Sequence, residues 1–475
     1  MNALAPLPHG AGTGINPTAV HETLAGIILL SIGLGVLFGV TITLPKNPHG
    51  EDYEDLVGAY LLALGYFIET NLHLREGTVE ILELDIIATP TTNPLSEAVL
   101  LDAKSGKSGF ADIFKMFGWM KYLDISKGCV VRTQSPDASK RDAMEVVKQA
   151  TNVHVATLDL ASDVVDLACL DGASIAMTDD VRTSILSAAW YGRIGQRKCL
   201  RAFIDFCKSE GDSVEAVKAA IDYRWAIEQA FLAPKPIRRA SRLYSAYSAS
   251  PQVTGGLIAH VAGGDATQEK AEWEKVRDLP ERLGFQYSLM LENTARLGIV
   301  KNALLHLLDK ESQPSTPKPK GPQEIDWSAF SEWTMPESFR TGLAALKAHP
   351  HRTKIPRLFQ IFIEVFGGFY RLGADDDLAH LSVCTGIPKE DIVPCLEMFN
   401  SFFPIPGGWF ISAKGEMAMM KMVPAVFRGT GAFVRGGLSR ETNYSRLYPQ
   451  MGWLVSKWHN ALYHVLEPHL KSPSA

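Results

Sequence analysis

Two short apolar runs with charged residues inside them constrain the fold of this chain more than any other feature. Residues 81–107 read ILELDIIATPTTNPLSEAVLLDAKSGK, in which ILELDIIA and AVLL flank a turn rich in Thr, Asn and Pro. Both runs are typical of β-strands, whose side chains alternate between two faces with a period of two. If the two strands pair, one face is apolar and packs into a core, and the other gathers charged side chains.

The charged face is predicted to carry Asp85 from the first strand, and Asp102 and Lys104 from the second. Burying a charge is costly unless the charge is paired or binds a metal ion. Two interpretations follow, a salt bridge at the mouth of a sheet or a metal site, and these residues alone do not separate them. Glu83 shares a face with Asp85 and is predicted to be a solvated edge charge, with an outer-shell metal ligand as the alternative.

Helical and extended patterns alternate around these strands. Tyr53, Leu56, Val57 and Tyr60 recur at helical spacing, and Gly65 is expected to end that helix. The later elements are predicted as a helix at 109–127, a strand at 128–134, a helix at 139–151 and a strand at 152–160. This alternation predicts an α/β domain over residues 46–162, with a mixed sheet flanked by helices.

The rest of the chain divides into three parts. Helical spacing predominates over residues 163–311, and residues 312–325 are rich in Pro and Lys, as expected for an extended linker. Residues 326–475 are predicted to form a winged-helix-like helical domain. Helix, turn and helix follow one another over residues 375–399, and FFPIPGGWFIS at 402–412 is predicted to be the hairpin wing.

The second helix of this winged-helix pattern, residues 389–398, is poorly suited to a DNA groove. It carries one lysine against Glu390, Asp391 and Glu397. Recognition helices of the DNA-binding type enter the major groove and face phosphates. DNA binding and protein–protein interaction both remain open for this domain.

An uncharged segment, residues 23–45, follows an N-terminal leader at 1–22. It is long enough for a transmembrane helix, and Lys46 after it favours a cytoplasmic C-terminal side. The prediction is a cytoplasmic protein tethered to the inner face of the membrane by residues 23–45. A buried helix and an N-terminal extension from an early start codon are the alternatives.

Composition limits the class of protein without naming a function. The chain has 475 residues, enough for two to four domains, and a formal net charge of −5, so nucleic acid would have to bind at local basic patches. Basic clusters occur at 235–242 and 349–357. The six cysteines contain no CxxC pair, which argues against a zinc ribbon or a disulfide framework.

The α/β block, over residues 53–160, resembles the Mrr-type branch of the PD-(D/E)XK nucleases, which have the restriction-endonuclease-like fold. That family has a helix with an aromatic-Glu pair ending in Gly-Tyr, an Asp in a strand, and acid-x-Lys at the end of the next strand. The matching residues here are Tyr53-Glu54, Gly65-Tyr66, Asp85 and Asp102-Ala103-Lys104. The chain departs from the family in a long stretch between Asp85 and Asp102, and in Asp where Glu or Gln is frequent.

The resemblance implies a Mg²⁺-dependent endonuclease, with Mn²⁺ as a substitute, that cuts DNA in restriction or anti-phage defence. It implies that Asp85, Asp102 and Glu54 hold the metal and that Lys104 acts on the attacking water. Double-stranded DNA is the expected partner, with a homodimer or a defence-system protein as a further one. The alternatives are a non-catalytic nuclease-fold scaffold, as a membrane-tethered sensor or adaptor, and a winged-helix transcription regulator.

Overall fold

The computed structural model describes residues 44–420 except for the gaps at 77–78, 96–97, 107–108, 135–137, 163, 168, 171–176, 178, 212, 264–281, 313–331, 372–374, 405–410 and 415–416. The predicted membrane segment therefore lies almost wholly outside the described residues. Arg428, Arg435 and Arg440, which the sequence offers in a Gly-rich stretch as further phosphate-binding candidates, lie outside them too. Among the described residues, none of the helices combines the length and apolar character needed to cross a bilayer.

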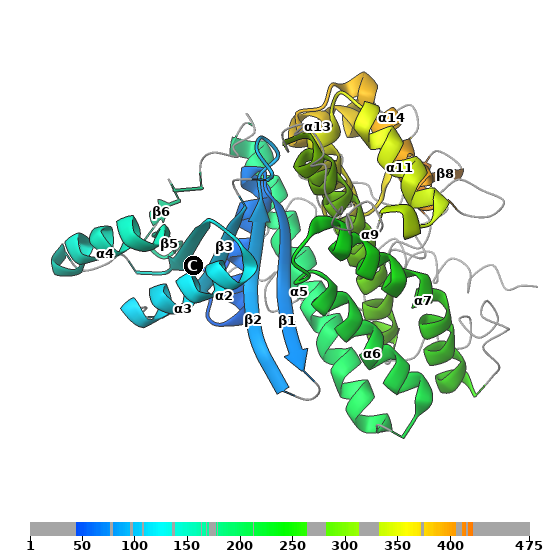
Figure 1. Cartoon of the computed structure of the whole chain (residues 1–475), viewed down its shortest axis with the longest axis horizontal. Helices are drawn as coiled ribbons and strands as arrows, with labels where there is room; N and C mark the ends of the chain where they lie inside the picture. Colours follow the sequence, from blue (N-terminus) through cyan, green and yellow to red (C-terminus); the bar gives the residue numbers. More distant parts are fainter. Residues whose placement is uncertain are drawn as a thin grey trace, which may run out of the picture.

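A six-stranded mixed sheet forms the first part of the structure (Figure 1). Its strands lie in sequence order; β1, β2 and β3 are antiparallel neighbours, β3, β4 and β5 are parallel, and β6 is antiparallel to β5. The elements are α2 Glu51–Leu64, β1 Phe67–Glu76, β2 Val79–Thr89, β3 Val99–Lys104, α3 Phe110–Leu123, β4 Lys127–Arg132, α4 Ala138–Thr151, β5 Val153–Asp159 and β6 Val164–Asp166.

This order confirms the predicted mixed sheet with flanking helices, with one correction. Strand β6 lies in a region predicted to be helical, and it extends the sheet beyond the expected end at residue 160. Three residues are too few to show a period of two, so the pattern carried no usable signal. The predicted end of α2 is confirmed, because Gly65 takes the left-handed conformation, with φ 115°, that glycine adopts without strain.

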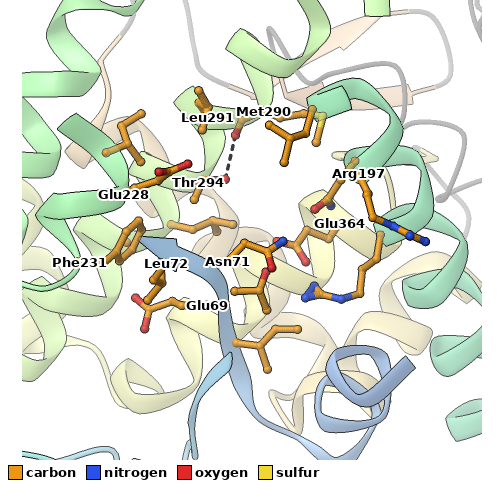
Figure 2. A pocket seen from close by; sticks show the side chains of 18 of the residues that line it. Glu69, Asn71, Leu72, Arg197, Glu228, Phe231, Met290, Leu291, Thr294 and Glu364 are labelled. Carbon is orange, nitrogen blue, oxygen red and sulfur yellow. Dashed lines mark hydrogen bonds between the residues drawn. The ribbon is translucent and has the colours of Figure 1, made fainter. Parts of the chain in front are cut away.

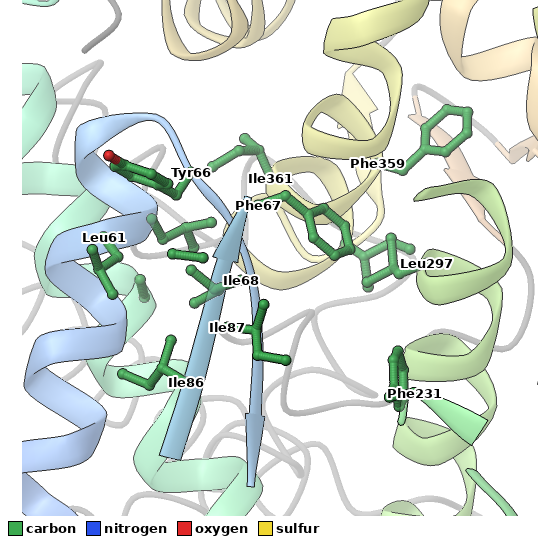
Figure 3. Packing of buried hydrophobic residues seen from close by; sticks show 14 of the residues in the cluster. Leu61, Tyr66, Phe67, Ile68, Ile86, Ile87, Phe231, Leu297, Phe359 and Ile361 are labelled. Carbon is green, nitrogen blue, oxygen red and sulfur yellow. The ribbon is translucent and has the colours of Figure 1, made fainter. Parts of the chain in front are cut away.

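Four long helices follow the sheet and pack against one another: α5 Asp179–Glu210, α6 Glu215–Ala230, α7 Pro236–Ala262 and α9 Arg282–Ser312. Helix α5 covers α2, and α6 packs on β1. Figure 3 shows apolar side chains from both regions around β1, with Phe67 beside Leu297 of α9. The sheet and the helices therefore share one continuous hydrophobic core.

The last described part consists of short helices and a three-stranded sheet in the order β7-β9-β8. Its elements are α11 Glu337–Ala348, the 3₁₀-helix η3 Arg352–Lys354, α12 Ile355–Gln360, the π-helix η4 Ile361–Val365, β7 Phe369–Arg371, α13 Asp375–Thr385, α14 Lys389–Phe402, β8 Ile411–Lys414 and β9 Met417–Met420. The hairpin predicted at 402–412 was placed too early. Helix α14 continues through Phe402, residues 405–410 are outside the described residues, and the paired strands are β8 and β9.

The outer edge of β1 is covered by side chains from α12. The Gln360 amide accepts a hydrogen bond from Ile68 N at 3.0 Å and donates one to Ile68 O at 2.9 Å, as a neighbouring strand would. Arg357 is fully buried and donates to Tyr66 O and Cys384 O. The basic cluster at 349–357 is therefore not a uniform surface patch, and Arg357 cannot contact a phosphate backbone as suggested from the sequence.

Two glycine-to-alanine variants should change stability in opposite directions. A Cβ at Gly342 of α11 would lie 2.5 Å from the ring of buried Phe402, whereas a Cβ at Gly118 of α3 meets nothing within 4 Å. Overpacking costs about 1–3 kcal/mol, which outweighs the helix-propensity gain of about 1 kcal/mol. Urea unfolding should show Gly342→Ala destabilised and Gly118→Ala stabilised; a stabilised Gly342→Ala would contradict the packing described for α11 and α14.

Candidate functional site

Strand pairing brings two of the predicted site residues together. Strands β2 and β3 are antiparallel, with Ile86 opposite Leu101, and the next residues in that register are Asp85 and Asp102. The backbone N–H of Ala103 donates to Asp85 Oδ2 at 2.8 Å. The two carboxyl groups interact directly, and the Asp102 charge contributes to a raised pKa of Asp85. The gathering of charge predicted from the period of two is thus confirmed.

Lys104 neutralises part of this charge. Its Nζ lies 2.8 Å from Asp102 Oδ1, and the Asp102 side chain is only 4% exposed while that of Lys104 is 33% exposed. Burial lowers the pKa of Lys104, but the hydrogen bond and charge of Asp102 and the charge of Asp85 outweigh it, and the pKa is raised. Lys104 is therefore a protonated ammonium group that is open to solvent on one side.

Glu54 comes to the same site from α2. Burial, together with the negative charges of Asp85, Asp55, Glu83 and Glu51, raises the pKa of Glu54 to about 7. Of these four charges, that of Asp85 raises the pKa of Glu54 the most. The Glu54 and Asp85 side chains therefore lie near each other, although 31 positions separate them in the sequence. Glu83 is exposed on β2, which agrees with the prediction of a solvated edge charge.

The arrangement is electrostatically frustrated in a way that a divalent cation would relieve. Burial and, after it, the Asp102 charge raise the pKa of Asp85, the Ala103 hydrogen bond and Lys104 oppose the rise, and the resulting pKa is about 6. Among the described residues, no group of three or more His, Cys, Asp or Glu side chains is gathered closely enough to hold a metal ion unaided. Mg²⁺ keeps several waters and binds proteins through one or two carboxylates, so the Asp85–Asp102 pair fits it chemically.

An arginine that sequence reasoning missed fixes the helix that carries Glu54. Arg197 of α5 forms ion pairs with Glu51 at 3.1 Å, with Asp55 at 2.9 Å and with Asp52. These three carboxylates surround Glu54 in the first turns of α2. Arg197 lies 145 positions from Asp52 in the sequence, so no local pattern could have revealed its role.

Two aromatic side chains of α3, near the site, differ in burial. Trp119 is partly buried against the core, whereas Tyr122 is 66% exposed. All six cysteines are free thiols, as the sequence predicted, although Cys129 Sγ and Cys169 Sγ lie 3.6 Å apart.

Replacing Asp85 with asparagine should stabilise the protein at neutral pH. The pKa of Asp85 is raised from 3.8 to about 6 in the folded state, so the native protein binds an extra proton between these pH values and loses stability as pH rises through them. The uncharged amide would remove this penalty, on the order of 3 kcal/mol, above about pH 6 and gain little below about pH 4. Urea unfolding in EDTA at about pH 4 and about pH 8 measures it; an equal effect at both pH values would contradict the raised pKa.

No family model, no curated protein and no solved structure matches this chain.

Proposed function

We propose that this protein is a metal-dependent endonuclease that hydrolyses DNA phosphodiester bonds. The observation that carries the proposal is the meeting of Glu54, Asp85, Asp102 and Lys104 at one end of the sheet, from one helix and two paired strands. Buried carboxylates that repel one another beside a lysine suit a site that receives both a divalent cation and a phosphate.

The order of elements supports a restriction-endonuclease-like domain. A helix leads into three antiparallel strands, and a second helix then crosses to a fourth strand parallel to the third. The acid-x-Lys triplet Asp102-Ala103-Lys104 falls at the end of β3, and Asp85 falls on β2 beside it. We propose membership of the Mrr-type branch on this combination, with restriction or anti-phage defence as the setting.

Each side chain has a defined part in the proposed reaction. A bound Mg²⁺ would supply an acidified water and stabilise negative charge at the phosphate. Asp85 and Asp102 provide hard oxygen ligands, and the Ala103 N–H holds Asp85 in orientation. Lys104, held by Asp102, presents its ammonium group to the phosphate and orients the attacking water. Glu54 would complete the site from α2 through a bound water.

The proposal is tested by incubating supercoiled plasmid and single-stranded DNA and RNA with the full chain, in Mg²⁺, in Mn²⁺ and in EDTA. Cutting of duplex DNA that requires either metal is the expected result. Cutting that persists in EDTA would contradict a metal-dependent mechanism. Cutting of RNA alone would show that the substrate is RNA and not DNA.

A second candidate is a non-catalytic scaffold that recruits a protein partner. In a scaffold, the Lys104–Asp102 ion pair would be a structural salt bridge. We propose that the series α12, β7, α13, α14, β8 and β9 forms the winged-helix-like unit of such a scaffold, and α14 exposes Glu390 and Glu397. An acidic face suits a basic protein partner better than DNA. Absence of cleavage on every nucleic acid, with a co-purifying protein lost on Glu390→Lys/Glu397→Lys, would favour this candidate.

A further inference from the structure

Two cavities in the described part of the chain differ in the chemistry of their walls. The cleft between β1 and the helices α5, α6 and α9, shown in Figure 2, is lined by charged side chains that pair with one another, among them Arg197 and Asp55. The other cavity, with a volume of about 330 Å³, lies between α4, β5 and β6. Its wall includes a nucleophile, the thiol of Cys169, which follows β6.

Cys169 is the one thiol of this chain that is not buried. All six cysteines lie in the described residues, and the other five are buried, whereas Cys169 is partly exposed. The exposed side chains of Arg141, Glu145 and Asp166 also line the cavity, so the cavity is open to solvent. A molecule as small as hydrogen peroxide can therefore reach Cys169 Sγ.

A second thiol is in contact with Cys169. Cys129 of β4 is fully buried, and its Sγ lies 3.6 Å from Cys169 Sγ, which is a hydrogen-bonding distance for sulfur. The backbone at Cys169 is held in place, because Lys127 Nζ donates to Cys169 O at 2.6 Å. Tyr66 OH donates to the next carbonyl, Leu170 O, at 2.5 Å. The two sulfurs therefore need only a small movement of their side chains to reach bonding geometry.

The surroundings of the two thiols give them different protonation states. The hydrogen bond with Cys129 and the ammonium group of Lys127 lower the pKa of Cys169, although burial and the charge of Asp166 oppose this. The same hydrogen bond, together with burial, raises the pKa of Cys129 well above the usual value of a thiol. Cys129 is therefore the donor of the shared hydrogen bond, and Cys169 is the acceptor. Accessible thiols of lowered pKa beside a second cysteine are those that oxidants attack.

Two buried cysteines provide the contrast. Burial raises the pKa of Cys199 and of Cys384 to about 12, so both thiols stay protonated near neutral pH. Their side chains are 1% and 0% exposed. Because the thiolate is the nucleophilic form of cysteine, these two residues are expected to be inert toward oxidants under the conditions in which Cys169 reacts.

We propose that Cys169 is a modification site that reacts with hydrogen peroxide, and that Cys129 then converts the product to a disulfide. In the first step the Cys169 thiolate attacks one peroxide oxygen, the O–O bond breaks and hydroxide leaves, so that Cys169 becomes a sulfenic acid. In the second step Cys129 Sγ attacks Cys169 Sγ, the S–O bond breaks, and the hydroxyl group leaves as water with the proton of Cys129. Both sulfurs are oxidised, and the peroxide is reduced to water.

The disulfide would join β4 of the sheet to the turn that follows β6, on the path of the chain toward α5. The reaction uses none of the residues of the proposed nuclease site, and the proposal does not rest on that function.

Mapping of the thiols in the full chain tests the proposal. The reduced protein, freed of reductant, is treated with a small molar excess of hydrogen peroxide near neutral pH, unfolded in an alkylating agent and mapped by mass spectrometry. Two of the six thiols should be lost, in a disulfide that joins Cys129 to Cys169 within one chain, and dithiothreitol should restore both. Retention of all six thiols, a disulfide between two chains, or a disulfide that involves another cysteine would overturn the proposal.

Variants at the two positions separate the two roles. Cys129→Ser and Cys129→Ala both lack the second sulfur, so peroxide should leave Cys169 as a sulfenic acid, which dimedone traps. Cys169→Ser should keep every remaining thiol under the same treatment, and Cys199→Ser, the control in the helical region, should form the disulfide as the wild type does. Oxidation of Cys129 in Cys169→Ser would contradict the assignment of Cys169 as the residue that peroxide attacks.

The pH dependence of alkylation by iodoacetamide tests the chemistry of Cys169 without an oxidant. In the wild type its apparent pKa should lie below about 8.5, the value of a free thiol, and Cys169 should react at least about ten-fold faster than Cys199 near neutral pH. Serine at position 129 keeps a donor to Cys169 and alanine does not, so the apparent pKa should rise in Cys129→Ala and much less in Cys129→Ser. A wild-type Cys169 with the pKa of a free thiol or higher would overturn the proposal.

Discussion

Asp102→Asn is expected to slow Mg²⁺-dependent DNA cleavage by about 100-fold or more, since it weakens metal binding and removes the partner that positions Lys104. Asp102 is almost fully buried, it interacts with Asp85, and its Oδ1 holds Lys104 at 2.8 Å. An asparagine keeps the shape of the side chain but not its charge. The metal would lose an anionic ligand, and Lys104 would lose its fixed position.

Binding of Mn²⁺, followed by electron paramagnetic resonance, tests the same variant without relying on cleavage. Asp102→Asn should weaken Mn²⁺ binding by about ten-fold or more, while Glu83→Gln, an exposed carboxylate on the same strand as Asp85, should change it by less than about three-fold. Equal metal affinity for the wild type and Asp102→Asn would show that this carboxylate is a structural partner of Lys104 and not a ligand.

Lys301→Met is expected to cost about 3–5 kcal/mol of folding stability, because it leaves a buried carboxylate without its ion pair. Lys301 of α9 and Glu69 of β1 pair across the junction of sheet and helices, and their side chains are 4% and 7% exposed. The charge of Arg239 also reaches Glu69, which places the expected cost toward the lower end of that range. Chemical denaturation of the wild type and the variant measures the difference.

The double variant Lys301→Met/Glu69→Leu should recover most of the lost stability, since replacing both members of a buried pair by apolar groups is often neutral. Lys148→Met serves as a surface control, because Lys148 and Glu145 are 38% and 55% exposed and such pairs contribute about 0–1 kcal/mol. If Lys301→Met lowered the free energy of unfolding no more than Lys148→Met, the Lys301–Glu69 pair would not stabilise the junction between sheet and helices.

The parts of the structure that could be predicted from the sequence are those set by local periodicity. The alternation in ILELDIIA places Asp85 on one face of β2, and the match between β2 and β3 then brings Asp102 beside it. The helical spacing that ends at Gly65 likewise placed Glu54 on α2. These signals need only a few neighbouring residues, and tertiary packing did not override them.

The parts that were missed depend on contacts between distant segments. Gln360 completes the edge of β1 at Ile68, and Arg197 collects the carboxylates around Glu54, yet both look like ordinary polar helix residues in sequence. The misplaced hairpin has a different cause. Pro-Gly-Gly at 406–408 is typical of a turn, but burial of Phe399 and Phe402 extends α14 into the predicted first strand.

The most direct test of the central claim compares plasmid cleavage by the wild type, Lys104→Ala and Lys115→Ala, each in Mg²⁺ and in EDTA. Lys115 is an exposed lysine on α3, outside the carboxylate site, and serves as the matched control. The account predicts cutting by the wild type and Lys115→Ala that stops in EDTA, and a loss of about 100-fold or more in Lys104→Ala. Cutting by Lys104→Ala at the wild-type rate would contradict the assignment of this site as the catalytic centre.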